Sequence, residues 1–242
     1  MRVKKRSPFI TGILDGLPIC LGYLSVSFAF GIFAVNSGLQ VWQAVLLSMT
    51  NVTSAGQLAA VPIIAAGGSL IELASSQLVI NLRYALMSVS LSQRLDGTVT
   101  VPHRLAISFV NTDEVFAVAS SRPGTVGRRY LYGLILTPFF GWSLGTLVGG
   151  IMGDLLPAVV TAALGIAIYG MFIAIVIPKA RSERPTALCV LLAVVMSCLF
   201  HYLPALQAVP QGFVIILCAV TASAVLALVA PVEQPEEVDD HA

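Results

Sequence analysis

Asn81, Leu82 and Arg83 place a permanent positive charge inside a segment that is otherwise suited to a membrane. The segment, residues 70–92, is long enough to cross a bilayer as a helix, since about 20 predominantly apolar residues suffice. A guanidinium cannot lose its proton to escape hydrocarbon, and burying it there costs on the order of 3 kcal/mol or more. We therefore expect Arg83 to meet a carboxylate or a water-filled path, and to serve function.

Three acidic residues are the candidate partners of this arginine. Asp15 lies about two turns into the first apolar segment, and Asp113 and Glu114 are adjacent in a later one. Glu72 is not a candidate, because it lies about 16 Å away along the same helix. Of the three, we expect Asp15 or Asp113 to pair with Arg83. Intramembrane carboxyl groups can carry protons, and an arginine can hold a substrate carboxylate in a bidentate fork. The alternatives are a purely structural ion pair and, for Asp113 and Glu114, a wet loop in which they cap a short helix.

Amide side chains and helix-breaking residues accompany these charges. Proline removes a backbone donor and disrupts a helix, and the carbonyls of a broken helix can coordinate a ligand where they face protein or water. The alternative is that the prolines only kink their helices and the amides only join helices by hydrogen bonds. The predicted helix breaks are Pro18, Gly56, Pro62 and Pro138, and the amides assigned to a substrate and proton pathway are Asn51, Gln57 and Asn81.

The composition requires a membrane around these groups. The chain has 242 residues, of which 57% are hydrophobic and 10% charged, whereas soluble domains carry roughly 25% charged residues. Its apolar runs are continuous rather than alternating, which favours helices over strands. The sequence predicts an all-α, polytopic helical bundle with seven or eight membrane-spanning segments and Pro/Gly-broken helices. The candidate spans are residues 9–35, 41–66, 70–92, 105–120, 130–153, 158–178, 186–203 and 211–230.

The basic residues predict the orientation of these spans. With a cytoplasmic N-terminus and eight crossings, nearly all Lys and Arg residues face the cytoplasm, and only Arg94 and Arg104 fall outside. Residues 105–120 are few and carry two acids, so a seven-helix arrangement stays open, in which this piece is re-entrant or another segment is broken.

The same pattern predicts three parts of the chain. Residues 1–8 form a basic cytoplasmic N-terminus, residues 9–230 a single transmembrane transport domain, and residues 231–242 an acidic disordered tail.

Glycines recur every four residues along residues 130–153, at positions 141, 145, 149 and 153. Such a stripe lets helix backbones approach closely in lipid, and we expect it to pack within the subunit, with a partner-protein interface as the alternative. Ser143 lies in a G-x-S-x-G string here, but an apolar helix lacks the strand–turn–helix context of a hydrolase elbow. We expect no enzymatic activity, no cofactor and no metal site. The net charge of +1 suggests no nucleic-acid partner.

Three strings carry a resemblance to a known family. They are Gly12-x-x-Asp15-x-x-Pro18, Asn81-Leu82-Arg83-Tyr84-Ala85-Leu86-Met87-Ser88 and Thr112-Asp113-Glu114-Val115-Phe116-Ala117. Together they make the chain, over nearly its whole length after residue 8, resemble the azaleucine-resistance AzlC family of branched-chain amino acid permeases. Ser25 to Gly31 and Thr53 to Leu58 depart from the family pattern, and both fall where we expect the binding site.

The resemblance implies export of branched-chain or related amino acids across the cytoplasmic membrane, with a small hydrophobic partner subunit of the AzlD type and with proton coupling. On this hypothesis Arg83 meets the substrate carboxylate, Asp15 or Asp113 meets its ammonium group, and Gln57 and Asn81 orient it. The alternative is a passive channel, or a scaffold subunit, for small polar solutes.

Overall fold

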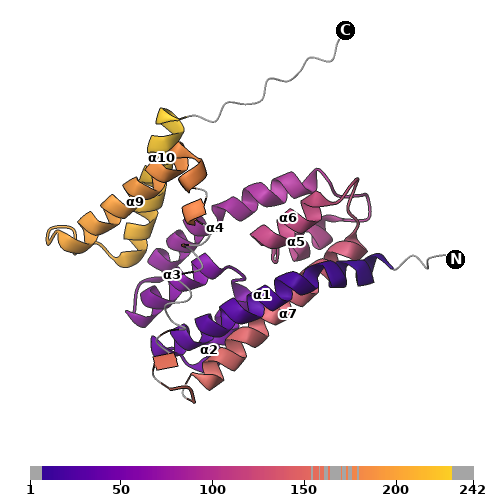
Figure 1. Ribbon diagram of the computed structural model, residues 1–242, viewed down its shortest axis with the longest axis horizontal. Coiled ribbons are helices and arrows are strands. Elements are labelled where there is room, and N and C mark those ends of the chain that lie inside the picture. Colours follow the sequence, from indigo (N-terminus) through magenta and orange to yellow (C-terminus); the bar gives the residue numbers. More distant parts are fainter. Residues whose placement is uncertain are drawn as a thin grey trace, which may run out of the picture. The chain divides into compact units, whose positions relative to one another are not determined.

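The structure, a computed structural model, describes residues 7–153, 155–157, 159–160, 163, 170, 173, 176–178 and 180–230. In these residues the regular structure is helical, as predicted, with no strand. The predicted span 158–178 lies largely outside the described residues, as do residues 1–6 and the acidic tail. The helices (Figure 1) are α1 (Pro8–Asn36), α2 (Val41–Thr50), α3 (Ser54–Ala65), α4 (Leu70–Ser92), α5 (Val101–Ser108), α6 (Asp113–Ser121), α7 (Arg128–Met152), α9 (Arg184–Tyr202) and α10 (Gln211–Val229).

The described helices fall into two compact groups. The first contains α1 to α7, and the second contains α9 and α10, which pack on each other. Among the described residues, α1, α7, α9 and α10 are long and apolar enough to cross a membrane. The chain is therefore a multi-pass membrane protein; the predicted count of seven or eight spans is not confirmed, and the single domain over 9–230 stays a prediction.

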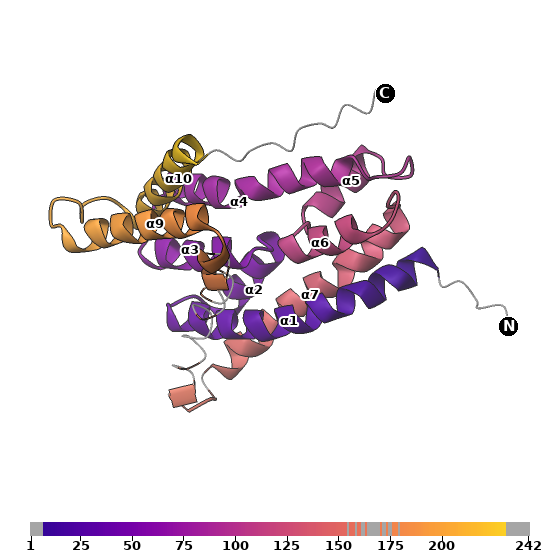
Figure 2. The same ribbon diagram turned by 45° about the horizontal axis from the view of Figure 1, so that its top comes forward.

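The first group is built on a close, parallel pair of helices, α1 and α7. Gly12, near the start of α1, faces the backbone of Tyr130 near the start of α7, and Gly31 faces Thr146 near the other end. Contacts at both ends run in the same order, so the two helices point the same way, as Figures 1 and 2 show.

The predicted glycine stripe makes this contact within the subunit. Cβ atoms added at positions 141, 145 and 149 of α7 would overlap the α1 backbone at Cys20, Leu24 and Phe28 respectively. Glycine therefore lets the two backbones touch directly, and the packing interpretation is confirmed for these three positions.

The end of the group at which α1 begins collects basic residues, and we call it the basic end. The backbone N–H of Asp96, just after α4, donates to the Val126 carbonyl just before α7, and the Val126 N–H donates to the Arg94 carbonyl. The Arg94 side chain donates to the Ser120 carbonyl at the end of α6. The end of α4, the end of α6 and the start of α7 therefore lie together. Every Lys or Arg within residues 7–153 except Arg83 lies at this end: Arg94, Arg104, Arg122, Arg128 and Arg129.

Helices α2 and α3 form a hairpin that enters from the opposite end. Val41 at the start of α2 lies against Gly150 of α7, and Ser48, two turns later, contacts Thr146. The chain turns at residues 51–53, and α3 then runs back beside α4, where the Gly56 carbonyl accepts a hydrogen bond from Gln77. At 1.5 Å per residue, α2 and α3 are about 15 and 18 Å long, roughly half the 30 Å hydrocarbon core.

Helices α5 and α6 form a second hairpin, which enters from the basic end. His103 in α5 contacts Tyr132 near the start of α7, and Arg122, just after α6, reaches Asp15 near the start of α1. Between them the chain turns at residues 109–112. These helices, with 8 and 9 residues, are about 12 to 14 Å long, so this hairpin also reaches only about half-way through a bilayer.

This arrangement corrects the predicted topology of the first group. Eight crossings would separate Arg94 and Arg104 from Arg122, Arg128 and Arg129 by a membrane, but the backbone hydrogen bonds hold both sets at one end. Residues 105–120 therefore do not cross as a span, and residues 41–66 are two half-length helices rather than one long one. The reason is that charge counting treats every apolar run as a crossing and cannot recognise a hairpin that returns to its own side.

The predicted helix breaks at three prolines are also wrong. Helices α1, α3 and α7 continue through Pro18, Pro62 and Pro138, because membrane helices tolerate proline where neighbouring groups satisfy the freed carbonyls. Gly56 lies in the first turn of α3, just after the true break at residues 51–53. Both true breaks end in a threonine that caps the next helix with its side chain.

The topology predicts which loops share a side. In a variant without the four native cysteines, single cysteines replacing Gly97 and Thr125 should react with a membrane-impermeant maleimide from the same side of the membrane. A cysteine at Ala66, in the loop between the hairpin and α4, should react only from the opposite side. Labelling of Gly97→Cys and Thr125→Cys from opposite sides would restore the eight-crossing topology.

The helix pair predicts a sharp difference between two Gly→Ala changes. A Cβ at Gly145 would lie 2.5 Å from the Leu24 carbonyl oxygen, whereas one at Gly22 meets nothing within 4 Å. Gly145→Ala should destabilise the protein by about 1–3 kcal/mol, measured by thermal unfolding in detergent. Gly22→Ala should be neutral or slightly stabilising, because alanine favours helix. Equal effects would mean that the close contact does not support the fold.

Candidate functional site

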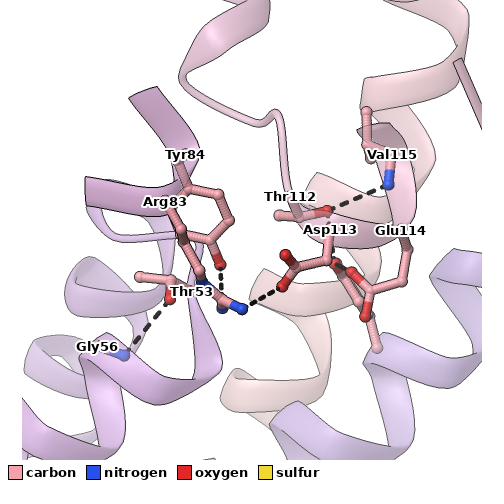
Figure 3. Close-up of polar contacts among 9 residues, drawn as sticks. Thr53, Gly56, Arg83, Tyr84, Thr112, Asp113, Glu114 and Val115 are labelled. Atoms are coloured by element: carbon pink, nitrogen blue, oxygen red, sulfur yellow. Dashed lines mark hydrogen bonds and ion pairs between the residues drawn. The ribbon is translucent and has the colours of Figure 1, made fainter. Parts of the chain in front are cut away.

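The tips of the two hairpins meet beside the middle of α4, where Arg83 lies. The Arg83 guanidinium forms an ion pair with Asp113 at the start of α6, with 2.8 Å between Nη1 and Oδ2. Figure 3 shows this pair between Thr53 of the first tip and Thr112 of the second. Both side chains of the pair are 46% exposed, so the pair opens away from the packed helices. Of the two acids predicted for Arg83, the structure pairs it with Asp113.

Tyr84 lies next to the ion pair. Arg83 Nη2 donates to the Tyr84 hydroxyl at 3.0 Å, and the Arg83 Cζ atom lies 4.8 Å from the centre of the Tyr84 ring. The Tyr84 hydroxyl also faces Thr53, as Figure 3 shows. Tyr84 therefore joins the arginine to the first hairpin tip, while Asp113 joins it to the second. The sequence analysis assigned no role to this tyrosine.

Two helix N-termini face this region. Thr53 caps α3 by accepting a hydrogen bond from the Gly56 N–H, and Thr112 caps α6 by accepting one from the Val115 N–H (Figure 3). Unpaired N–H groups and the helix dipole make an N-terminus attractive to anions. With Arg83 between them, the two tips provide positive potential at about half the depth of a bilayer.

Glu114 faces α1 rather than Arg83. Its Oε2 accepts a short hydrogen bond from the hydroxyl of Tyr23, which also lies 2.6 Å from Thr112 Oγ1. The Tyr23 ring packs edge-on against Trp142 of α7, with 5.1 Å between ring centroids. Tyr23, like Tyr84, was not predicted. Both are aromatic residues in apolar helices, where residue type and spacing do not indicate that a hydroxyl reaches a hairpin tip.

Asp15 belongs to a separate cluster nearer the basic end. Its Oδ2 accepts hydrogen bonds from Arg122 Nη1 at 3.1 Å and from the Tyr130 hydroxyl at 2.9 Å. The Arg122 guanidinium stacks over the Tyr130 ring at 4.0 Å. Asp15 therefore neutralises a different arginine from the one at the hairpin tips.

The remaining predicted amides hold the first hairpin in place. Gln77, which was not predicted, donates to the Gly56 carbonyl at 2.9 Å and accepts from Asn51 at 2.8 Å and from Asn81 at 3.3 Å. The spacing of residues 77, 81 and 84 on one helical face is a signal from which this position could have been found. The Oδ1 atoms of Asn81 and Asn111 are buried and, among the described residues, have no hydrogen-bond partner.

Gln57 is fully buried in a chain of hydrogen bonds. Trp142 Nε1 donates to its Oε1 at 2.8 Å, and its Nε2 donates to Ser48 Oγ at 2.7 Å. Ser48 continues to Thr146 at 2.7 Å, and Thr146 returns to the Trp142 carbonyl. Gln57 thus fixes the hairpin to α7, and its predicted contact with substrate stays a prediction. Ser143 lies inside α7 and donates to the Phe139 carbonyl, away from any strand–turn–helix elbow among the described residues.

Comparison with known proteins identifies the family. A family model described as AzlC protein matches residues 18–156. The chain belongs to the AzlC family. The matched range contains α1 from Pro18 onward, both hairpins, α4 and α7, and with them the Arg83–Asp113 pair.

Relatives of this AzlC family chain are membrane proteins. It is 31% identical over 195 residues to the inner membrane protein YgaZ of Escherichia coli, covering 77% of this chain and 78% of YgaZ. It is 29% identical to an uncharacterized membrane protein of Archaeoglobus fulgidus, over 76% of this chain and 82% of that protein. A Helicobacter pylori membrane protein is 26% identical over 60% of this chain and 66% of its own length. No solved structure matches significantly.

The buried hydrogen-bond chain predicts a strong effect of Gln57→Leu. This change leaves the buried Trp142 N–H without its acceptor, at about 1–3 kcal/mol, and leaves the Ser48 hydroxyl with Thr146 but without the Gln57 amide. Thermal unfolding in detergent should therefore show a clear loss of stability. The control Gln93→Leu removes an exposed glutamine at the end of α4 and should change stability by less than about 0.5 kcal/mol. A Gln57→Leu protein as stable as the control would show that the chain contributes little.

Proposed function

We propose that the protein is a secondary transporter that exports branched-chain or related small apolar amino acids across the inner membrane. In this proposal it is proton-coupled, has no enzymatic activity and is the large subunit of a permease with a small AzlD-type partner. Membership of the AzlC family supports the permease role. The basic end of the first group supports an orientation with that end in the cytoplasm.

The observation that carries the proposal is the half-exposed Arg83–Asp113 pair at the junction of two half-length hairpins. A zwitterionic amino acid brings one carboxylate and one ammonium group. Inserted between the two side chains, it replaces one ion pair by two, so no charge is left uncompensated at this depth. Arg83 and the N-termini of α3 and α6 receive the carboxylate, and Asp113 receives the ammonium group.

The hairpins also supply a way to open the site toward either side. One hairpin closes the site from the basic end and the other from the opposite end, and each is held by hydrogen bonds at its tip. Transporters with discontinuous helices bind substrate at such mid-depth junctions and expose it alternately. Asp113 lies at this junction, whereas Asp15 pairs with Arg122 nearer the basic end, so Asp113 is the better candidate for the substrate ammonium.

A passive channel is the second candidate, and the opposed hairpins themselves favour it. Non-helical backbone at membrane depth is tolerated where it lines a water-filled path. In proteoliposomes a coupled exporter concentrates its substrate against a gradient when a pH difference is imposed, whereas a channel only equilibrates it.

Arg83→Ala should abolish amino-acid transport while the protein still reaches the membrane. A hydrogen bond to a charged group is worth about 1.5–3 kcal/mol, which corresponds to about 10- to 150-fold in affinity. The measurement is uptake of radiolabelled leucine, isoleucine and valine into proteoliposomes, with membrane content checked by immunoblot. Arg83→Lys should recover only part of the activity, because lysine cannot form the bidentate fork.

Arg129→Ala is the matched control, since Arg129 lies at the basic end away from Asp113. It should keep transport near the wild-type rate. Normal transport by Arg83→Ala would remove the centre of this proposal.

A further inference from the structure

The three acidic residues predicted for the pathway differ in their partners. Asp15 is paired with Arg122, and Asp113 is paired with Arg83. Glu114 is hydrogen-bonded to the neutral hydroxyl of Tyr23, and no basic side chain among the described residues lies within ion-pair distance of it. Only one of the three is therefore free of a counter-ion in the described structure.

This difference decides which acid can take up a proton at low cost. Protonating Asp113 or Asp15 leaves a guanidinium without its counter-charge, and a guanidinium cannot give up its own proton in compensation. Protonating Glu114 leaves no described basic side chain without its counter-charge, and it removes the repulsion between two adjacent carboxylates, Asp113 and Glu114. The charge balance of the site thus favours Glu114 as the group that gains and loses a proton.

The surroundings of Glu114 come from three helices. From α1, Tyr23 faces it; from α6 itself, Thr112 and Asp113 flank it; and from α4, Arg83 and Tyr84 face Asp113 on the other side. Glu114 is exposed, although Tyr23 lies near the middle of α1. A charged group at that depth does not face lipid, so its exposed side lies against water or protein.

We propose that Glu114 and Tyr23 form the proton-binding element of the transporter, and that substrate and proton compete for the site. The proposal rests on the function proposed above. When Glu114 is ionised, the Tyr23 O–H donates to it. When Glu114 binds a proton from water, its new O–H donates to the Tyr23 oxygen, and the Tyr23 O–H turns to Thr112 Oγ1, already 2.6 Å away.

The reversal of this hydrogen bond links the proton to the hairpin tip. Thr112 caps α6, directly before Asp113 and its ion pair with Arg83. A substrate ammonium at Asp113, the residue adjacent to Glu114, attracts the Glu114 carboxylate and favours its ionised form, so binding of the amino acid releases the proton. Competition of this kind makes the protein an antiporter, which exports an amino acid in exchange for an entering proton.

The test compares wild-type protein with Glu114→Gln, which keeps the shape of the side chain but cannot ionise. In weakly buffered detergent solution, adding leucine to the wild type should release protons, recorded with a pH-sensitive dye. Glu114→Gln should bind leucine and release none. In proteoliposomes it should lose pH-driven accumulation at least 10-fold, whereas leucine–leucine exchange should fall by much less.

Two further variants keep the test decisive. Tyr23→Phe removes the relay hydroxyl and should weaken accumulation more than exchange, while Glu183→Gln, just before α9, should match the wild type. Proton release or pH-driven accumulation by Glu114→Gln overturns this proposal, as does complete loss of its leucine binding and exchange. A wild-type protein that neither binds nor moves amino acids overturns the proposed function itself. This outcome differs from failure of the present proposal, because the wild type then shows no binding, proton release, accumulation or exchange.

Discussion

The ion pair between Arg83, near the middle of α4, and Asp113 is the interaction on which the arrangement of the two hairpins depends. Arg83 needs a carboxylate close by and polar groups around it, and no single continuous helix can supply both. The two hairpins solve this by bringing helix N-termini, capping threonines and Asp113 to the middle of α4. The half-length of α2, α3, α5 and α6 is what places the tips at that depth.

Both hairpins are attached to the pair formed by α1 and α7. Their backbones touch along the glycine positions, so the pair acts as one thick element rather than as two independent helices. The first hairpin is bound to α7 through the hydrogen bond between Gln57 and Trp142. The second is bound to α1 through the hydrogen bonds of Tyr23 with Thr112 and Glu114. The two attachments differ in kind: Gln57 in the first is fully buried, whereas Glu114 in the second is exposed.

Residue type decides which members of the site could be recognised from the sequence. Charges and amides inside apolar segments stand out because they are costly there, so Arg83, Asp113, Glu114 and Asn81 could be named directly. Tyr23 and Tyr84 could not be assigned a role in this way, because tyrosine is common in apolar helices. Gln77 shares a helical face with Asn81, and only this spacing could have indicated its role. Prolines were misleading, since their neighbours allow α1, α3 and α7 to continue through them.

The sequence by itself determined that the chain is helical, lies in a membrane, and carries an arginine that needs an acid. It also determined that α7 presents a smooth glycine face, because residues four positions apart lie on the same face of a helix. Only the tertiary structure decided that Arg83 pairs with Asp113, that Asp15 pairs with Arg122, and that two segments turn back as hairpins. The physical reason is that an apolar run can lie in a membrane either as one crossing helix or as two half-length helices. Contacts between residues distant in sequence select between the two.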